Sequence, residues 1–216
     1  MSRRSVCLFA LALSMAGASA RAEDIAPDSC RSGAFLSEGA VVALYRVASK
    51  RPLHFNDDDA GCPAAAGCRR AAYVIGGDEL LVSKVQAGWA CAWYQGKARE
   101  TVGWVAADAL APLPEPPVKL SDWIGHWQGA IGAIEIAPGQ PGTLDVRGSA
   151  SWGSGGSVHV GEIGGLIRPQ GRHARLGADA NACLVDFDRV GRYLIVRDNR
   201  RCGGVNVSFD DVYVRK

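Results

Sequence analysis

The chain has 216 residues, 48% of them hydrophobic and 21% charged, with 24 lysine and arginine side chains against 22 aspartates and glutamates. A formal net charge of +2 without a basic cluster argues against a nucleic-acid partner. The length and apolar content instead predict globular domains that bury cores of their own.

Residues 1–22 are typical of a secretory signal peptide, with two arginines near the start, an apolar run over 6–16 and small residues at 18–22. The apolar run is too short to span a bilayer as a permanent helix. Cys7 lies within it, without the residues that flank a lipidated cysteine. Cleavage after residue 22 leaves 21 basic and 22 acidic side chains, a net charge near −1. We therefore expect a periplasmic or secreted protein with no membrane anchor.

Six of the seven cysteines remain after cleavage. An even number in an exported chain predicts disulfides rather than catalytic thiols. Zinc is the alternative, but the sequence has no CxxC pair and no neighbouring histidine pair. Cys183 and Cys202 stand alone in the second half and should pair, whereas the other four allow three connectivities. The favoured pairs among those four are Cys62 with Cys68, which closes the loop over 63–67, and Cys30 with Cys91.

A proline-rich stretch at residues 111–117 divides the chain. Four prolines in seven residues cannot serve a central strand or a helix interior, so we expect a semi-rigid extended spacer. The predicted division is a signal peptide at 1–22, an N-terminal domain at 23–111, a proline-rich linker at 112–118 and a C-terminal domain at 119–216.

Residues 71–110 contain dense short strands separated by glycine-containing turns. Such a pattern argues for a small β-barrel. The expected strands cover 73–75, 79–85, 89–94 and 102–105.

The same stretch resembles the second half of a bacterial SH3 domain. GGDELLVSKVQAGWACAWY followed by TVGWVAADAL is similar to the family's strand after Gly-Asp, its Gly-Trp strand and its closing Gly-Trp-Val segment, and the resemblance extends over 39–114. The first half departs from the family, because residues 53–59 and a cysteine loop replace its arginine, serine, glycine and proline segment. The resemblance implies an SH3-like barrel that binds a peptidoglycan peptide or a periplasmic protein.

Aromatic side chains of this module are the predicted ligand-binding residues, namely Trp89, Trp93 and Tyr94. Exposed aromatic rings give a large contact area at low entropic cost. Trp89 matches the position of the family's ligand-facing tryptophan and is the first choice, whereas Trp104 is expected in the core. The alternative is that two of these four aromatics only pack inside the small barrel.

The second domain is rich in glycine and has almost no helical periodicity. Six to eight antiparallel strands with short connections predict a β-barrel or meander. The segment DWIGHW at 122–127 resembles the opening tryptophan motif of calycin-type barrels, which implies that Trp127 plugs one end of the core. Residues 198–209 look like a closing hairpin clamped by Cys202, in which Gly203-Gly204 allows a tight reversal. The expected strands cover 127–136, 143–152, 158–167, 182–188, 193–198 and 205–214.

We find no catalytic constellation in the sequence. The four histidines, His54, His126, His159 and His173, are scattered, no serine stands in a nucleophile elbow, and no glycine-rich loop carries a phosphate-binding lysine. The acidic run NDDD at 56–59 could bind calcium, but its acids are contiguous and lack EF-hand spacing, so a solvated turn is favoured. The loop SWGSGGS at 151–157 should be flexible, and its Trp152 would be an aromatic contact if the loop faces a partner.

The leading hypothesis is an exported, non-enzymatic binding protein without a cofactor or metal, whose SH3-like module binds a cell-wall peptide or a partner protein. The alternative is an inhibitor of a lysozyme or another exported hydrolase, acting through the C-terminal barrel. A hydrolase that depends on one of the four histidines is the third hypothesis. The sequence leaves the oligomeric state open.

Overall fold

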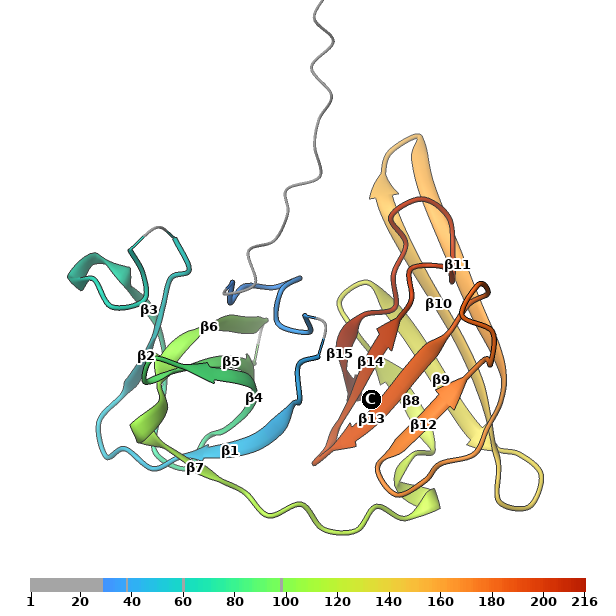
Figure 1. The fold of residues 1–216 in the computed structure, drawn as a ribbon, viewed down its shortest axis with the longest axis horizontal. Coiled ribbons are helices and arrows are strands. Elements are labelled where there is room, and N and C mark those ends of the chain that lie inside the picture. Colours follow the sequence, from blue (N-terminus) through green and yellow to red (C-terminus); the bar gives the residue numbers. More distant parts are fainter. Residues whose placement is uncertain (1–28, 38, 60, 98) are drawn as a thin grey trace, which may run out of the picture.

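The computed structural model describes residues 29–216 apart from 38, 60 and 98, so the predicted signal peptide lies outside the described residues. Two antiparallel sheets lie side by side, one from each half of the chain (Figure 1). This confirms the predicted all-β class. Within the described ranges, no helix has both the length and the hydrophobicity needed to cross a membrane.

The N-terminal sheet has seven strands in the order β3-β2-β6-β5-β4-β1-β7. The strands expected at 79–85, 89–94 and 102–105 are present as β4 to β6, and the one expected at 73–75 is the end of β3, which already begins at Arg69. The strands β1, β2 and β7 are added to them. The bounds are β1 Ala43–Val47, β2 Leu53–Asn56, β3 Arg69–Val74, β4 Glu79–Gln86, β5 Trp89–Gln95, β6 Glu100–Ala106 and β7 Leu110–Pro112, with short 3-10 helices at Ala66–Cys68 and Ala107–Ala109.

The hairpin between β4 and β5 shows how local sequence directs this sheet. Gln86 pairs with Trp89, and the two residues between them, Ala87 and Gly88, have φ values of 47° and 81°. A two-residue turn with positive φ at both positions matches the right-handed twist of the flanking strands. The turn therefore sets which face of β5 carries its tryptophans.

The C-terminal sheet has eight strands in the order β11-β10-β9-β8-β15-β14-β13-β12. Its edge strands β11 and β12 come close to each other, so the sheet is nearly closed into a barrel, as predicted. Trp127 is buried inside it. The bounds are β8 Gly125–Gln128, β9 Gly132–Pro138, β10 Leu144–Ser154, β11 Ser157–Ile167, β12 His173–Leu176, β13 Val185–Val190, β14 Tyr193–Asp198 and β15 Asp211–Arg215, preceded by a 3-10 helix at Leu120–Asp122.

The expected strand at 127–136 is wrong, because the chain turns between β8 and β9. The carboxylate of Asp211 accepts a hydrogen bond from the backbone N–H of Ala130 at 2.6 Å, which holds this turn. A Cβ atom at Gly129 would lie 2.5 Å from Asp211 Oδ2, so glycine is needed there. The sequence pattern did not indicate the turn because the residue that caps it comes some 80 positions later.

The expected strand at 205–214 is also too long, since only β15 at its end is extended. A tight turn does begin at Gly204, whose carbonyl accepts the N–H of Val207 at 3.1 Å, but the positive φ values in this loop belong to Arg200 and Asn206. Gly203 is needed because a Cβ atom there would lie 2.8 Å from Val207 Cβ and 2.9 Å from the Cα of Gly161 on β11. The loop thus packs backbone to backbone on β11.

Three disulfides form as predicted, pairing Cys30 with Cys91, Cys62 with Cys68, and Cys183 with Cys202. Stable disulfides of this number are typical of oxidising compartments outside the cytoplasm. The chain therefore functions in an extracytoplasmic location.

The predicted linker is partly a strand, because Pro112 belongs to β7 and the irregular segment begins at residue 113. It is also not the only connection between the two halves. A hydrophobic cluster spans both sheets, with Leu44, Trp93 and Val102 from one and Tyr193 and Val212 from the other. The two sheets thus share a core at their contact face.

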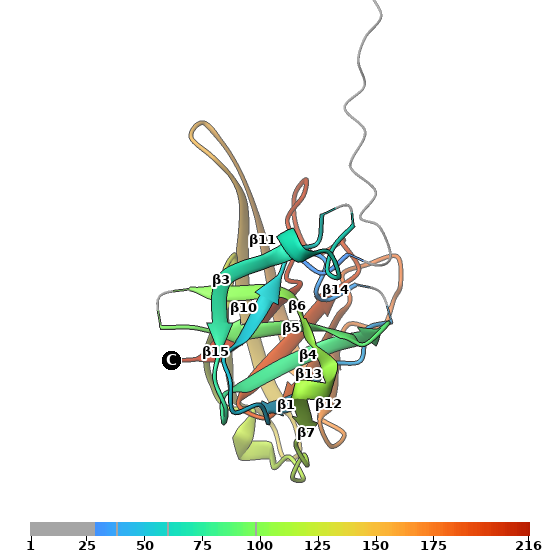
Figure 2. The ribbon, with the colours of Figure 1, turned by 90° about the vertical axis from the view of Figure 1, so that its left-hand side faces the viewer.

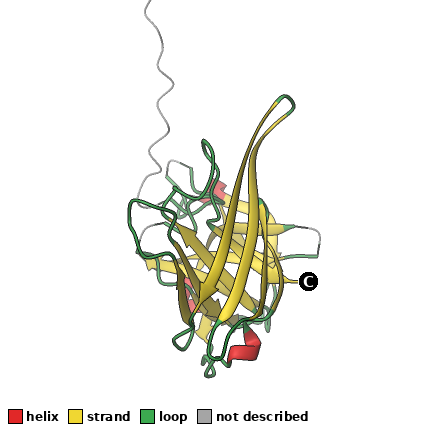
Figure 3. Cartoon of the chain, turned by 90° about the vertical axis from the view of Figure 1, so that its right-hand side faces the viewer, coloured by secondary structure: helices red, strands yellow, loops and turns green. Residues whose placement is uncertain are grey.

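One hairpin extends well beyond the barrel. β10 and β11 pair along their whole length, from Leu144 with Ile167 to Ser154 with Ser157. Figures 2 and 3 show their tips rising above the other strands. The projecting part carries Trp152, which is 48% exposed, and Val160, which is 64% exposed.

Candidate functional site

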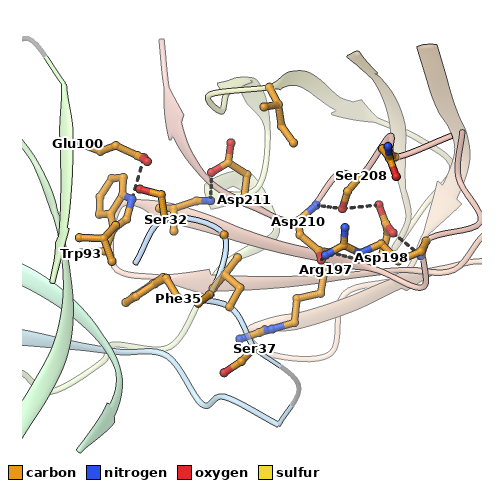
Figure 4. A pocket seen from close by; sticks show the side chains of 18 of the residues that line it. Ser32, Phe35, Ser37, Trp93, Glu100, Arg197, Asp198, Ser208, Asp210 and Asp211 are labelled. Carbon is orange, nitrogen blue, oxygen red and sulfur yellow. Dashed lines mark hydrogen bonds and ion pairs between the residues drawn. The ribbon is translucent and has the colours of Figure 1, made fainter. Parts of the chain in front are cut away.

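A cleft of about 940 Å³ lies between the N-terminal sheet and the C-terminal barrel (Figure 4). Pockets at domain contacts are common ligand sites because two surfaces can supply different chemistry. One wall is the turn over residues 32–37, the second is the β5–β6 hairpin, and the third is the end of β14 with the loop that leads to β15. We take this cleft as the candidate functional site.

The turn at 32–37 is held in place by the neighbouring disulfide. Cys30 is bonded to Cys91 in the middle of β5, which fixes the start of the segment to the N-terminal sheet. The backbone N–H groups of Ala34 and Phe35 donate to the carbonyl of Arg31 at 2.9 and 3.0 Å. Phe35 is buried in the core that joins the two sheets. The cleft wall is therefore anchored covalently and by packing.

Trp93 forms the aromatic floor of the cleft. Its indole lies edge-on to the ring of Tyr193, with the ring centroids 5.3 Å apart and the planes at 81°. Such an edge-to-face pair is favourable for aromatic rings. The indole N–H donates to Glu100 Oε2 at 2.8 Å. The ring of Trp93 therefore packs on Tyr193 while its N–H is hydrogen-bonded to Glu100.

Acidic side chains from the barrel line the opposite wall. Burial raises the pKa of Asp211 to about 6, and the negative charge of Glu100 adds to this, although N–H groups of the β8–β9 turn counteract it. Burial also raises the pKa of Asp210. Two carboxyl groups that are partly desolvated and face a cleft are sites where a cationic or hydrogen-bond-donating ligand group would be stabilised.

Two arginines accompany these acids. Arg200 forms an ion pair with Asp210 at 3.0 Å. Arg197 donates to the backbone carbonyl of Ala40 at 2.7 Å and to Asp188 at 3.3 Å, which ties the barrel to the N-terminal half. The cleft thus presents both signs of charge beside an aromatic floor.

Asp198 organises the loop on this side of the cleft. Its carboxylate accepts hydrogen bonds from the hydroxyl of Ser208 at 3.2 Å and from the backbone N–H of Phe209. Its own N–H donates to Asp210 at 2.6 Å. These bonds fix the segment that carries the acidic wall, so Asp198 positions the site.

Only one of the three predicted ligand-binding residues, Trp93, lines the cleft. Trp89 lies on the same face of β5, but it is half-buried against the edge of the shared core. Tyr94 faces the other side of the strand and packs on the core of the N-terminal sheet. Their roles in binding stay predictions, but the structure does not bring the three together. Trp104 is buried, as expected, and donates to Asp58 at 2.9 Å.

The acidic run at 56–59 makes internal contacts. Burial alone would raise the pKa of Asp58, but hydrogen bonds from Ser29 and Trp104 outweigh it and lower the pKa below its usual range. Asp57 lies 3.5 Å from Arg70. Among the described residues no group of three or more His, Cys, Asp or Glu side chains is placed to hold a metal ion.

Sequence reasoning missed most of the cleft, including Phe35, Glu100, Arg197, Asp210 and Asp211. Their separation along the chain gave no local pattern. One signal was present, since the pair Asp210-Asp211 directly precedes the apolar run Val212–Val214 of β15. Acidic residues at the start of a strand mark the rim of a sheet, where functional side chains gather.

The chain matches no protein-family model, no curated protein and no solved structure.

Proposed function

We propose that this chain is an exported, non-enzymatic binding protein that holds a peptide segment in the cleft between its two sheets. The peptide belongs either to the cell wall or to a periplasmic protein. The observation that carries the proposal is that a single cleft takes an aromatic floor from one sheet and an acidic wall from the other. The bacterial SH3 resemblance of residues 39–114 supports the same kind of ligand.

The chemistry of the cleft suits an extended peptide. A peptide offers backbone donors and acceptors along its length, and the lining supplies matching groups from Ser32, Ser37 and Asn206. Trp152 stands at the mouth with 48% of its surface exposed, where it can cover an apolar side chain of the ligand. Exposed tryptophans of this kind often dominate the energy of protein recognition.

Replacing Trp152 by alanine tests the proposal. The mature protein should be retained by purified peptidoglycan sacculi or should bind their stem peptides, and W152A should weaken this binding about tenfold, the size of a moderate recognition hot spot. The melting temperature should stay nearly unchanged, because the side chain is half exposed. Binding can be followed by co-sedimentation and calorimetry.

Trp89→Ala is the matched control, since Trp89 does not line the cleft. It should leave binding intact if the ligand occupies the cleft. The reverse result, with W89A abolishing binding and W152A neutral, would move the site to the groove expected from the SH3 resemblance. If the wild type shows no binding, the proposed ligand class is wrong.

A second function, inhibition of a lysozyme or another exported hydrolase, is favoured by the projecting hairpin of β10 and β11 (Figure 2). Val158 and Val160 lie on its outer face with 54% and 64% of their surfaces exposed. A rigid hairpin with an apolar face can enter the substrate groove of a hydrolase at low entropic cost. The full mature chain should then inhibit lysozyme, and V158S with V160S should relieve the inhibition. Unimpaired lysozyme at micromolar concentrations of the protein would rule this out.

A further inference from the structure

A second cavity, of about 630 Å³, lies under the linker at the other end of the contact between the two sheets. The linker, which runs along the bottom of Figure 1, forms one side through residues 115–118. The turn at 171–172, the β13–β14 turn and Arg215 of β15 form the rest. This linker cavity does not overlap the cleft, and it has a different chemistry.

The lining of the linker cavity is strongly basic. Only two carboxylates, Glu115 and Asp122, belong to it, and each already has a partner. Glu115 pairs with Arg172, and Asp122 accepts the backbone N–H of Lys119 at 2.8 Å. The arginines of the lining are Arg172, Arg189, Arg192 and Arg215.

Three of these arginines reach only neutral acceptors within the part of the chain that the structure describes. Arg189 donates to the carbonyls of Gly191, at 3.0 Å, and Tyr193. Arg192 donates to the hydroxyl of Tyr193 at 2.9 Å. Arg215 donates to the carbonyl of Asp122. Three positive charges therefore meet in one cavity without an ion pair of their own among the described residues.

Arg189 is the most informative of them, because only 5% of its surface is exposed and its Nε atom has no hydrogen-bond partner. Its guanidinium carbon lies 4.5 Å from the ring centre of Trp127, and that of Arg215 lies 4.8 Å from the same ring. Burial, together with the charge of Arg215, lowers the pKa of Arg189 to about 10. Cation–π contacts compensate part of the cost of burying this charge, but they leave the N–H donor unmet.

Glu115 supplies the complementary feature, since its Oε1 atom is buried without a hydrogen-bond donor. These two unmet atoms have almost no accessible surface, so they lie beside the linker cavity, and the lining itself offers the net positive charge of its arginines. Inorganic phosphate carries between one and two negative charges near neutral pH, whereas a carboxylate carries one, so this lining attracts phosphate more strongly.

We propose that the linker cavity binds a small oxyanion, a phosphate group in preference to a carboxylate. The guanidinium groups of Arg192 and Arg215 donate to its oxygens, and the buried charge of Arg189 adds to the attraction. The planar fork of arginine matches tetrahedral and planar oxyanions alike, and its hydrogen bonds to such anions are among the strongest in proteins. The site does not depend on the function proposed for the cleft.

The test uses the oxidised mature chain labelled with ¹⁵N-arginine and follows the Nε–Hε signals by NMR. Inorganic phosphate, added at constant ionic strength, should shift the Arg189 signal in a saturable way. Acetate at the same concentrations should shift it less or only at higher concentration. Arg189→Lys keeps the charge but lacks Nε–H, so the missing signal identifies Arg189.

Two arginine variants separate the site from general ionic effects. Arg192→Gln should weaken phosphate binding about tenfold, the loss expected for one hydrogen bond to a charged group. The control is Arg147→Gln, because Arg147 is exposed on β10, pairs with Asp145 and lies outside the linker cavity. It should leave the phosphate affinity unchanged.

Three results would overturn the proposal. One is an Arg189 signal that phosphate and acetate both leave in place. Another is a shift that rises linearly with anion concentration and never saturates. The third is an equal loss of affinity in R192Q and R147Q, which would show that overall charge is responsible. Saturable binding of acetate that is tighter than that of phosphate would instead assign the cavity to a carboxylate, such as a peptide C-terminus.

Discussion

The N-terminal sheet and the C-terminal barrel are stabilised in different ways. The barrel encloses a large core that includes Trp123, Trp127 and Phe187. The core that belongs to the N-terminal sheet alone has Phe55 as its main aromatic residue, together with valines, leucines and alanines. The tryptophans of this sheet, among them Trp93 and Trp104, lie in the core shared with the barrel. The sheet thus depends on the barrel more than the barrel depends on the sheet.

Trp93→Ala should have the largest effect of any single change at the contact between the two sheets. Replacing a buried tryptophan by alanine costs about 3–5 kcal/mol in the free energy of unfolding. Because the lost contacts lie in the shared core, amide protons of β4 to β6 should lose more exchange protection than those of β9 and β10. Hydrogen exchange measured by NMR or mass spectrometry distinguishes the two regions.

The control for this change is Trp89→Ala, which removes a half-buried ring at the margin of the same core and should cost far less. Equal loss of protection in both sheets of W93A would show that the chain unfolds as one unit. In that case the conclusion that the N-terminal sheet depends on the barrel more than the barrel depends on the sheet would be wrong.

The double change Cys183→Ser with Cys202→Ser should come next in size. The two cysteines are 19 residues apart, and closing a loop of that length stabilises a fold by about 3 kcal/mol in the chain-entropy model. The effect should be largest on β13 and β14 and smaller on β4 to β6, which are affected only through the core that they share with these two strands. Urea unfolding together with hydrogen exchange checks both parts.

Peptide mapping under non-reducing conditions tests the covalent basis of this prediction. Cys183 and Cys202 should be found only with each other. A bridge from either of them to Cys30, Cys62, Cys68 or Cys91 would contradict the separation of the two halves.

Acid titration should separate the two regions by the sign of its effect. The pKa of Asp211 in the barrel is raised to about 6, so the folded state binds the proton more tightly than the unfolded state. Its contribution to stability is present below about pH 4 and is lost as the pH rises to about 6, a change on the order of 1–3 kcal/mol. Asp211→Asn should remove this part of the pH dependence, as urea unfolding between pH 4 and 7 would show.

Asp58 in the N-terminal half provides the opposite case. Hydrogen bonds keep its pKa below the usual range, so its contribution is present at neutral pH and is lost as the pH falls through the lowered value. Asp58→Asn should therefore change stability near neutral pH and converge with the wild type in acid. The same direction of pH dependence in both variants would contradict the two assignments.

The parts of the fold that follow local patterns could be predicted from the sequence. Strands such as β5 and β14 alternate or run continuously between clear turns, and the pair Cys183–Cys202 followed from its position in the second half, whereas the pairs in the first half were the favoured choice among three connectivities. The turn at Gly129 could not be predicted, because it depends on Asp211 far along the chain. The same reason hides the cleft and the linker cavity. Both are built where segments distant in sequence meet, so no window of sequence contains them.

The position of β15 has a consequence for the order of folding. β15 lies between β8 and β14, so it joins the part of the barrel formed by β8 to β11 to the part formed by β12 to β14. Trp127 pairs with Arg215, which follows it by 88 positions, and contacts of such long range are slow to form. All the strands of the N-terminal sheet precede residue 113. That sheet can therefore assemble before the C-terminal part of the chain is available for folding. The barrel cannot close before β15 is available, and until then the apolar face of β5 and β6 is not covered by the barrel strands.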